Sequence, residues 1–222
     1  MDLFDRLRAA RPEAWRAYVE HRFVADLGDG TLPKAAFDAY LVQDWLFLIQ
    51  FARAYALAVY KGRDLADMRA AQAGLAAILD VEMDLHVRLC ERRGIPLAVL
   101  ETTPEHRATV AYTRFVLDTG LRGDLLDLHV ALAPCIVGYA EIATRLMERP
   151  GALDPANPYA EWIVEYAGDV YLQVARAART HLDRLAERSL TEARFADLAE
   201  IFARASLLEA DFWSMGLEAA VD

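Results

Sequence analysis

Cysteine is almost absent from this chain of 222 residues, which contains only Cys90 and Cys135. Two cysteines are too few for the disulfide framework of a small secreted domain, and neither belongs to a CxxC pair. Residues 1–6 place acids where a secretory signal needs basic residues followed by an apolar run. We therefore expect a protein of the reducing cytoplasm.

Excess basic charge and long uncharged runs are also missing. The net charge of −10 argues against a nucleic-acid partner, because such a footprint needs clustered lysine and arginine. The longest run without a formally charged residue, 128–140, is shorter than the roughly 18 apolar residues of a membrane span. We expect neither a nucleic-acid partner nor a membrane-spanning segment.

Glycine and proline are scarce, with eleven and eight residues, whereas an average chain has roughly 12% of the two together. Apolar residues reach 55%, which excludes disordered and fibrous classes. Alanine, leucine, glutamate and arginine dominate, and apolar residues recur at spacings of three and four. The sequence predicts an all-α fold.

Turn residues divide the chain into about eight helices, and no linker or repeat separates them. We therefore expect a single helical domain over residues 1–222, large enough to bury roughly 70% of its unfolded surface. The expected helices cover residues 3–26, 34–61, 64–91, 104–119, 124–148, 158–167, 169–188 and 191–217.

Asp44 interrupts an apolar stripe in the expected helix 34–61. Its neighbours on the stripe include Leu41, Leu48 and Phe51, at helical spacing. A buried carboxylate is costly unless it is paired or hydrogen-bonded, so Asp44 requires a partner from the protein or from a ligand. The alternative is an aspartate that only caps or ties helices.

Glu209 falls in the same way into the apolar stripe of the last helix, at i+4 from Ala205. Desolvation would raise the pKa of such a carboxyl and make it a usable general acid or base. The alternative is a structural glutamate bound to the backbone or to Arg204.

Cys135 follows a proline inside the apolar helix 124–148. Pro134 removes a backbone donor, Tyr139 shares the face of Cys135, and Gly138 allows a close approach. A buried cysteine is usually inert packing, but beside a carboxylate base it becomes a nucleophile with its proton acceptor. We expect Cys135, Asp44 and Glu209 to line one small cavity.

Aromatic residues supply expected walls for a flat heteroaromatic ligand: Phe47, Tyr112, Trp162 and Tyr166. Each of them also fits an ordinary core position. Glu82 and His86 are spaced as metal ligands, but Glu141 is the one further candidate and His181 has no paired acid. We expect no metal, and we expect Glu82 and His86 to hold each other or to cap loops.

These residues form an ordered set of motifs. In chain order they are Phe23-Val24, Gly30-Thr31-Leu32-Pro33, Tyr40-Leu41-Val42-Gln43-Asp44-Trp45, Glu82-Met83-Asp84-Leu85-His86, Ala111-Tyr112-Thr113-Arg114-Phe115, Ala133-Pro134-Cys135 with Gly138-Tyr139, Asn157-Pro158-Tyr159 with Trp162 and Tyr166, and Glu209 with Phe212-Trp213-Ser214-Met215. The set resembles the cysteine-containing class of the TenA family, the thiaminase II type proteins of thiamine salvage. The resemblance covers nearly the whole chain and implies the haem-oxygenase-like all-α fold.

The resemblance implies an aminopyrimidine aminohydrolase without a cofactor. Its substrate would be 4-amino-5-aminomethyl-2-methylpyrimidine, which is hydrolysed to the hydroxymethyl pyrimidine and ammonia; thiamine is cleaved by related members. Cys135 would attack the pyrimidine ring, Glu209 would shuttle protons, and Asp44 would bind the amidine-like edge of the ring.

The remaining implied roles belong to aromatic side chains. Tyr139 would orient Glu209 or Cys135, Tyr166 would stack on or bond the ring, and Tyr112 would help to close the pocket. Family members often carry tyrosine where this chain has Phe47, so we expect ring stacking to be kept with one hydrogen bond fewer. The usual assembly of the family implies a homotetramer.

Two alternatives belong to other functional classes. A haem-oxygenase-like di-iron oxidase would bind iron through Glu82, His86 and Glu141. A non-catalytic pyrimidine-binding or regulatory protein would use the same pocket without turnover.

Overall fold

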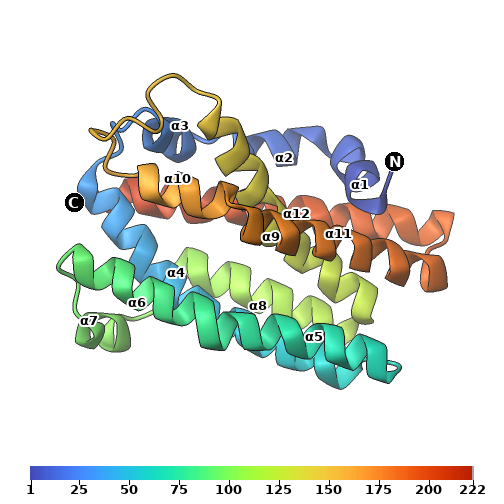
Figure 1. Cartoon of the computed structure of the whole chain (residues 1–222). Helices are drawn as coiled ribbons and strands as arrows, with labels where there is room; N and C mark the ends of the chain where they lie inside the picture. Colours follow the sequence, from blue (N-terminus) through green and yellow to red (C-terminus); the bar gives the residue numbers. More distant parts are fainter. Residues whose placement is uncertain (222) are drawn as a thin grey trace. The chain divides into compact units, whose positions relative to one another are not determined.

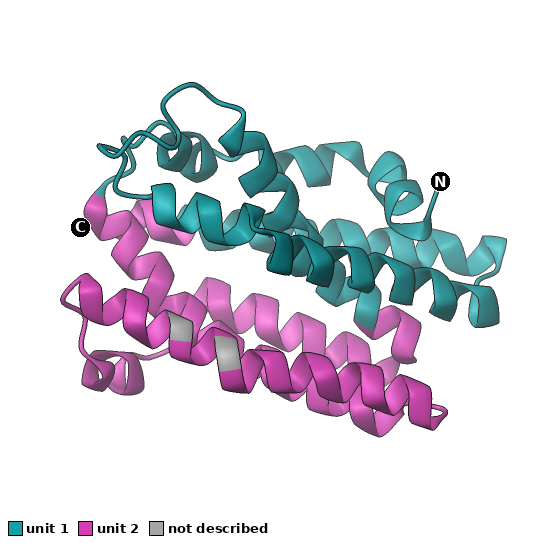
Figure 2. Cartoon of the chain, viewed as in Figure 1, with its two compact units in different colours: residues 1–33, 129–214 teal, residues 34–128, 215–222 magenta. Residues whose placement is uncertain are grey.

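The computed structural model describes residues 1–221, apart from the side chains of Val81 and Leu85. Within these residues the chain forms helices joined by turns, without a strand, and the all-α prediction is confirmed (Figure 1). The chain divides into two compact units (Figure 2). Unit 1 contains residues 1–33 and 129–214, and unit 2 contains residues 34–128 and 215–222. Residue 222 of the expected single domain lies outside the described residues, and the single domain stays a prediction.

Unit 1 combines three short amino-terminal helices with long helices from the second half of the chain (Figure 2). Two of the long helices, α9 and α12, also extend into unit 2 by a few residues. The helices are α1 (Leu3–Ala10), α2 (Pro12–Val19), α3 (Arg22–Gly28), α9 (Leu125–Met147), α10 (Ala160–Ala167), α11 (Asp169–Ser189) and α12 (Glu192–Glu218).

The expected helix 3–26 is wrong in its continuity, because three short helices replace it. Pro12 occupies the first turn of α2, where a missing backbone N–H costs nothing, and it ends α1 before it. His21 has an extended backbone and its Nδ1 accepts a hydrogen bond from the Phe23 N–H, which starts α3. Apolar spacing runs through both breaks, so periodicity alone did not separate the helices.

Unit 2 is built around a long helix, α4, whose bounds match the prediction of 34–61. The unit also contains a short helix between residues 96 and 103 that was not expected. Its elements are α4 (Lys34–Lys61), α5 (Leu65–Ala77), the π-helical turn η1 (Ile78–Glu82), α6 (Met83–Arg92), α7 (Leu97–Thr102) and α8 (Arg107–Arg122).

The expected helix 64–91 is continuous but contains a π-helical turn. The Met83 N–H donates to the Ile78 oxygen, five residues earlier, where an α-helix would use the residue four earlier. Such a turn is rare and often lies at a functional site. Here it directly precedes the segment that contains His86.

Asn157 holds the loop before α10 to the end of α3 within unit 1. Its Nδ2 donates to the backbone oxygens of Ala152, Leu27 and Gly28 at 2.9, 3.3 and 3.2 Å. Its Oδ1 accepts from the Tyr159 N–H at 2.9 Å. The Asn157-Pro158-Tyr159 motif therefore has a structural role, since Asn157 satisfies backbone groups of its own loop and of the end of α3.

Replacing Asn157 with alanine is expected to destabilise the protein by about 2–3 kcal/mol, because buried carbonyls lose their donor. The midpoint of thermal unfolding should fall by about 5–10 °C. Differential scanning calorimetry measures this shift. The control is Glu165→Ala on α10, an exposed position, where the change should stay within about 0.5 kcal/mol. Equal midpoints for the two variants would contradict the structural role of Asn157.

Helix α9 is the one helix among the described residues that is long and apolar enough to cross a membrane. Within its most apolar window, 83% of the residues are buried in the protein. A core helix of a globular protein has the same length and composition, and burial explains why α9 is so apolar.

Candidate active site

Cys135 is exceptional within the buried middle of α9. Every residue from 128 to 140 is buried except Cys135, which is partly exposed. Its thiol is not in a disulfide. Pro134 lies inside the helix and has no N–H to donate to the Val130 oxygen. Cys135 is therefore the one residue of this run with appreciable exposed surface, while the residues around it are closed off from solvent.

The other cysteine has the opposite environment. Cys90 on α6 is fully buried. Burial, followed by the negative charges of Asp44 and Asp38, raises the pKa of Cys90 to about 11. Because the thiolate is the nucleophilic form, Cys90 is inert at neutral pH and Cys135 is the candidate nucleophile.

Gly138 accommodates an aromatic ring, as its position near Cys135 suggested. A Cβ atom at residue 138 would lie 2.2 Å from Cε1 of Tyr18 on α2. No side chain larger than hydrogen fits at this distance unless the ring moves. The close approach expected at Gly138 is therefore made by Tyr18, within unit 1.

Tyr139 belongs to an aromatic cluster in unit 1. Its ring centroid lies 4.9 Å from that of Tyr166, 5.7 Å from Trp162 and 5.4 Å from Trp213. Trp162 and Tyr166, which were expected to share a face of α10, are 4.6 Å apart. The cluster joins α9, α10 and α12, and Tyr166 is its partly exposed member.

Glu209 lies in the middle of α12 and is only 2% exposed. Its carboxylate therefore faces inward, as the apolar stripe indicated. It lies one helical turn before Trp213, a member of the aromatic cluster. Its position on a long helix within unit 1 restricts its motion, as an acid–base group requires.

Asp44 in unit 2 has the partner that its burial requires, and the partner is His86. His86 Nε2 lies 2.6 Å from Asp44 Oδ2, and the Tyr40 hydroxyl donates to the same oxygen at 3.3 Å. Asp44 is 6% exposed and His86 is 3% exposed. The expectation that Glu82 and His86 hold each other was incomplete, because His86 uses only the backbone oxygen of Glu82.

The charges around His86 shift two pKa values. Burial lowers the pKa of His86, but the Asp44 carboxylate and its hydrogen bond outweigh burial, and the net shift is upward. Burial is also the largest effect on Glu82 and raises its pKa to about 7, although the neighbouring His86 opposes the rise. His86 and Tyr40 were missed as site residues. The sequence did indicate that the buried Asp44 needs a partner, and a search for that partner could have found them.

Phe47 and Tyr112 form the aromatic wall of unit 2. Their ring centroids lie 5.0 Å apart with the planes inclined by 33°, and both side chains are buried. Phe47 lies one turn after Asp44 on α4, and Tyr112 lies on α8. The structure therefore brings three predicted residues of unit 2, Asp44, Phe47 and Tyr112, onto two adjacent helices.

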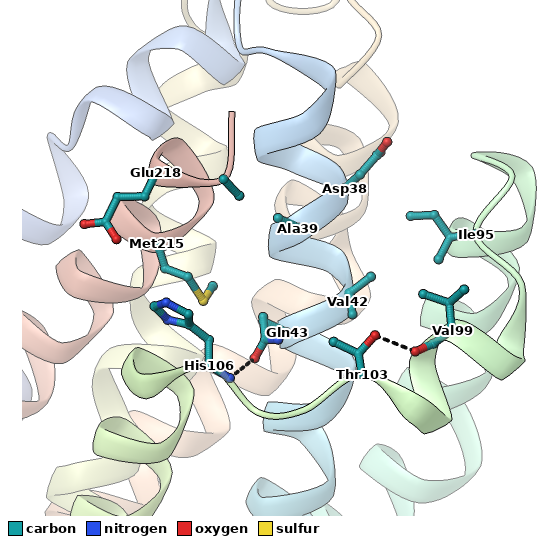
Figure 3. Close-up of a pocket in the computed structure, with 11 residues that line it drawn as sticks. Asp38, Ala39, Val42, Gln43, Ile95, Val99, Thr103, His106, Met215 and Glu218 are labelled. Atoms are coloured by element: carbon teal, nitrogen blue, oxygen red, sulfur yellow. Dashed lines mark hydrogen bonds between the residues drawn. The ribbon is translucent and has the colours of Figure 1, made fainter. Parts of the chain in front are cut away.

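Unit 2 also contains a cavity of about 470 Å³, but the predicted site residues do not line it (Figure 3). Its walls are mainly apolar, with Val42, Val99 and Met215 among them. Most of its polar side chains are already hydrogen-bonded: Asp38 to Arg93, Gln43 to the Pro104 oxygen and the His106 N–H, Thr103 to the Val99 oxygen, and Glu218 to Arg107. The cavity therefore offers few free polar groups to orient a small ligand.

The carboxylate that the di-iron alternative needed is engaged elsewhere. Glu141 accepts hydrogen bonds from Arg8 Nη1 at 3.0 Å and Trp15 Nε1 at 3.2 Å within unit 1. Across the described part of the chain, no group of three or more histidine, cysteine or acidic side chains is placed to hold a metal ion.

The seven predicted site residues are distributed over the two units. Cys135, Tyr139, Tyr166 and Glu209 belong to unit 1, whereas Asp44, Phe47 and Tyr112 belong to unit 2. The expected cavity that joins the thiol to both acids stays a prediction.

The chain is thus an all-α protein whose helices carry a partly exposed cysteine, buried carboxylates and clustered aromatic rings. The model of the TENA/THI-4/PQQC family matches residues 8–219. The chain belongs to this family, and the resemblance found in its motifs is confirmed.

The relatives agree in sequence and in fold. The chain is 42% identical over 202 residues to the aminopyrimidine aminohydrolase of Halalkalibacterium halodurans, covering 90% of this chain and 89% of that protein. A TenA family transcription regulator from Silicibacter sp. TM1040 is 45% identical, with a TM-score of 0.92 and coverage of 97% and 96%. A domain of haem-oxygenase-like fold from Shewanella denitrificans has a TM-score of 0.74 at 13% identity, covering 97% and 92%. This last similarity confirms the predicted fold class.

Proposed function

We propose that this protein is an aminopyrimidine aminohydrolase of thiamine salvage. It would hydrolyse 4-amino-5-aminomethyl-2-methylpyrimidine to the hydroxymethyl pyrimidine and ammonia. The observation that carries the proposal is the partial exposure of Cys135 within the buried run 128–140 of α9. The relative from Halalkalibacterium halodurans that is named for this activity supports it.

The proposed reaction begins with addition of the Cys135 thiolate to a carbon of the pyrimidine ring. An aromatic ring resists attack, so a ring nitrogen must take a proton as the carbon–sulfur bond forms. The electron pair gained by the ring then breaks the bond between the methylene carbon and the amine. Protonated by Glu209, the amine leaves as ammonia. Water adds to the methylene carbon, and the carbon–sulfur bond breaks to restore the aromatic ring and the thiolate.

Asp44 and the aromatic residues would hold the pyrimidine during these steps. Asp44 would accept a hydrogen bond from the amidine-like edge of the ring. Phe47 and Tyr112 would pack on the ring face, while Tyr166 would stack on or bond the ring. Tyr139 would orient Glu209 or Cys135. Phenylalanine at position 47 keeps the apolar wall but has no hydroxyl, which affects the choice of substrate more than the chemistry.

The test supplies the purified protein in parallel with the aminomethyl pyrimidine, its formylated precursor and thiamine. Ammonia is measured enzymatically, and the pyrimidine product is measured by chromatography. We expect the aminomethyl pyrimidine to release ammonia and hydroxymethyl pyrimidine in equal amounts. Absence of product from all three compounds would contradict the proposed activity.

A pyrimidine-binding regulator is the second candidate, because the relative from Silicibacter is named a transcription regulator. A regulator needs the pocket but not the thiol chemistry. We also expect a homotetramer in the cytoplasm, and light scattering coupled to size-exclusion chromatography measures the assembly.

A further inference from the structure

The two oxygens of the Asp44 carboxylate have different surroundings. Oδ2 lies against His86 Nε2 and accepts from the Tyr40 hydroxyl. Both hydrogen bonds that the described residues make to this carboxylate are on Oδ2, and neither uses Oδ1. The side chain is 9% exposed, so Oδ1 is an acceptor that a ligand with a hydrogen-bond donor can use.

The hydrogen bonds of His86 define its protonation state. Its Nδ1 lies 3.3 Å from the backbone oxygen of Glu82, which can only accept, so Nδ1 carries a hydrogen. Nε2 lies 2.6 Å from a carboxylate oxygen, which also accepts, and the raised pKa of His86 agrees with a proton on this nitrogen too. Both ring nitrogens thus face acceptors, an arrangement that favours the imidazolium form.

The charged groups that face this imidazolium come from two elements. Asp44 faces it from α4, and Glu82 faces it from the π-helical turn. Glu82, with a pKa of about 7, gains its charge as pH rises through neutrality and then also stabilises the imidazolium. Asp44 and Glu82 are therefore the two acidic groups that favour the imidazolium form of His86.

His86 and Tyr40 fix the orientation of Asp44 from two directions. Tyr40 lies one turn before Asp44 on the same helix, whereas His86 comes from α6. Two donors on one oxygen leave the carboxylate little freedom to rotate. The direction of Oδ1 is therefore set before any ligand arrives, and this lowers the entropy cost of binding.

We propose that His86 is a positioning residue that holds Asp44 through Oδ2 and directs Oδ1 toward the exocyclic 4-amino group of the pyrimidine. This inference rests on the proposed function. It also explains selection of the substrate class, because a 4-oxo pyrimidine presents an acceptor where Oδ1 needs a donor. Such a compound would place two acceptors in contact and leave them unsatisfied.

Titration calorimetry with the hydroxymethyl pyrimidine tests the proposal without turnover. His86→Gln keeps a side-chain donor but removes the cation, and it should weaken binding by about 10-fold or more. Tyr40→Phe removes only a neutral donor and should weaken binding less. The control is His106→Asn, which removes an imidazole from the same unit and keeps an acceptor for the cap of α8. It should bind like the parent.

The pH dependence of binding separates positioning from a merely structural role. Because the pKa of His86 is raised, the imidazolium is present below its ordinary value and is lost as pH rises through the raised value. Parental affinity should fall on this alkaline side, and the fall should be absent in His86→Gln. Parental affinity and parental pH dependence in His86→Gln would overturn the proposal.

Nitrogen-15 NMR of histidine-labelled protein gives a readout that needs no ligand. In a pH series, one ring, absent from the spectrum of His86→Gln, should keep protons on both nitrogens to a pH above the ordinary pKa of histidine. His129, whose pKa burial lowers to about 3, supplies a neutral reference. A His86 ring that loses its second proton at or below the ordinary pKa of histidine would refute the positioning role. Failure of the parent to bind the pyrimidine would instead contradict the proposed function, so the two failures are distinguishable.

Discussion

Serine in place of cysteine at position 135 is expected to lower ammonia release from the aminomethyl pyrimidine by about 1,000-fold or more. A serine hydroxyl has nearly the same size but stays protonated at neutral pH, so it cannot add to the ring as a thiolate does. The measurement is the steady-state rate of ammonia release, with circular dichroism to verify the helical fold.

Cys90→Ala is the matched control for this experiment. Cys90 is fully buried and its pKa is raised to about 11, so its thiol takes no part in the reaction. The control should lose some stability, because a buried side chain becomes smaller, but it should keep the parental rate. Equal rates for the parent and Cys135→Ser would remove the mechanism and favour a binding protein.

Glutamine at position 209 is the second replacement with a large expected effect, a decrease of about 100-fold or more in kcat. The amide has nearly the shape of the carboxyl, but it neither takes a proton from the thiol nor gives one to the leaving amine. KM should change much less than kcat, because the amide still fills the same buried space on α12.

The control for Glu209 is Glu200→Gln on the same helix. Glu200 is exposed and forms an ion pair with Arg11 at the surface. Exposed pairs contribute little to stability, so this variant should keep the parental kcat. A Glu209→Gln variant with parental kcat would show that another group transfers the protons.

The sequence predicted a long helix well where residues that disfavour helix mark both of its ends. Pro33 and Gly62 bracket α4, and its observed bounds match the prediction. The amino-terminal helices were predicted less well. There, Pro12 and His21 start new helices without interrupting the apolar spacing.

The buried acids could be located from sequence, but their partners could not. The apolar stripe indicated that Asp44 faces inward, and the cost of burying it indicated that a partner exists. Spacing favours pairs within one helix, so His86 was assigned to Glu82 at i+4 and not to Asp44, 42 residues away. Such a pairing depends on how α4 and α6 pack, which one sequence does not specify.

The π-helical turn η1 contains one residue more than an α-helical turn, and this affects where the chain between α5 and α6 can change in length. An α-helix rotates by roughly 100° with each residue. Deleting one residue between positions 78 and 82 would convert η1 to an ordinary α-helical turn, and the imidazole at position 86 would still face α4 because the π-turn absorbs the extra residue. Deleting a residue between the π-turn and position 86 would instead rotate the imidazole away from Asp44 by roughly 100°. Relatives that keep this histidine–aspartate pair should therefore vary in length at the π-turn and not between it and the histidine.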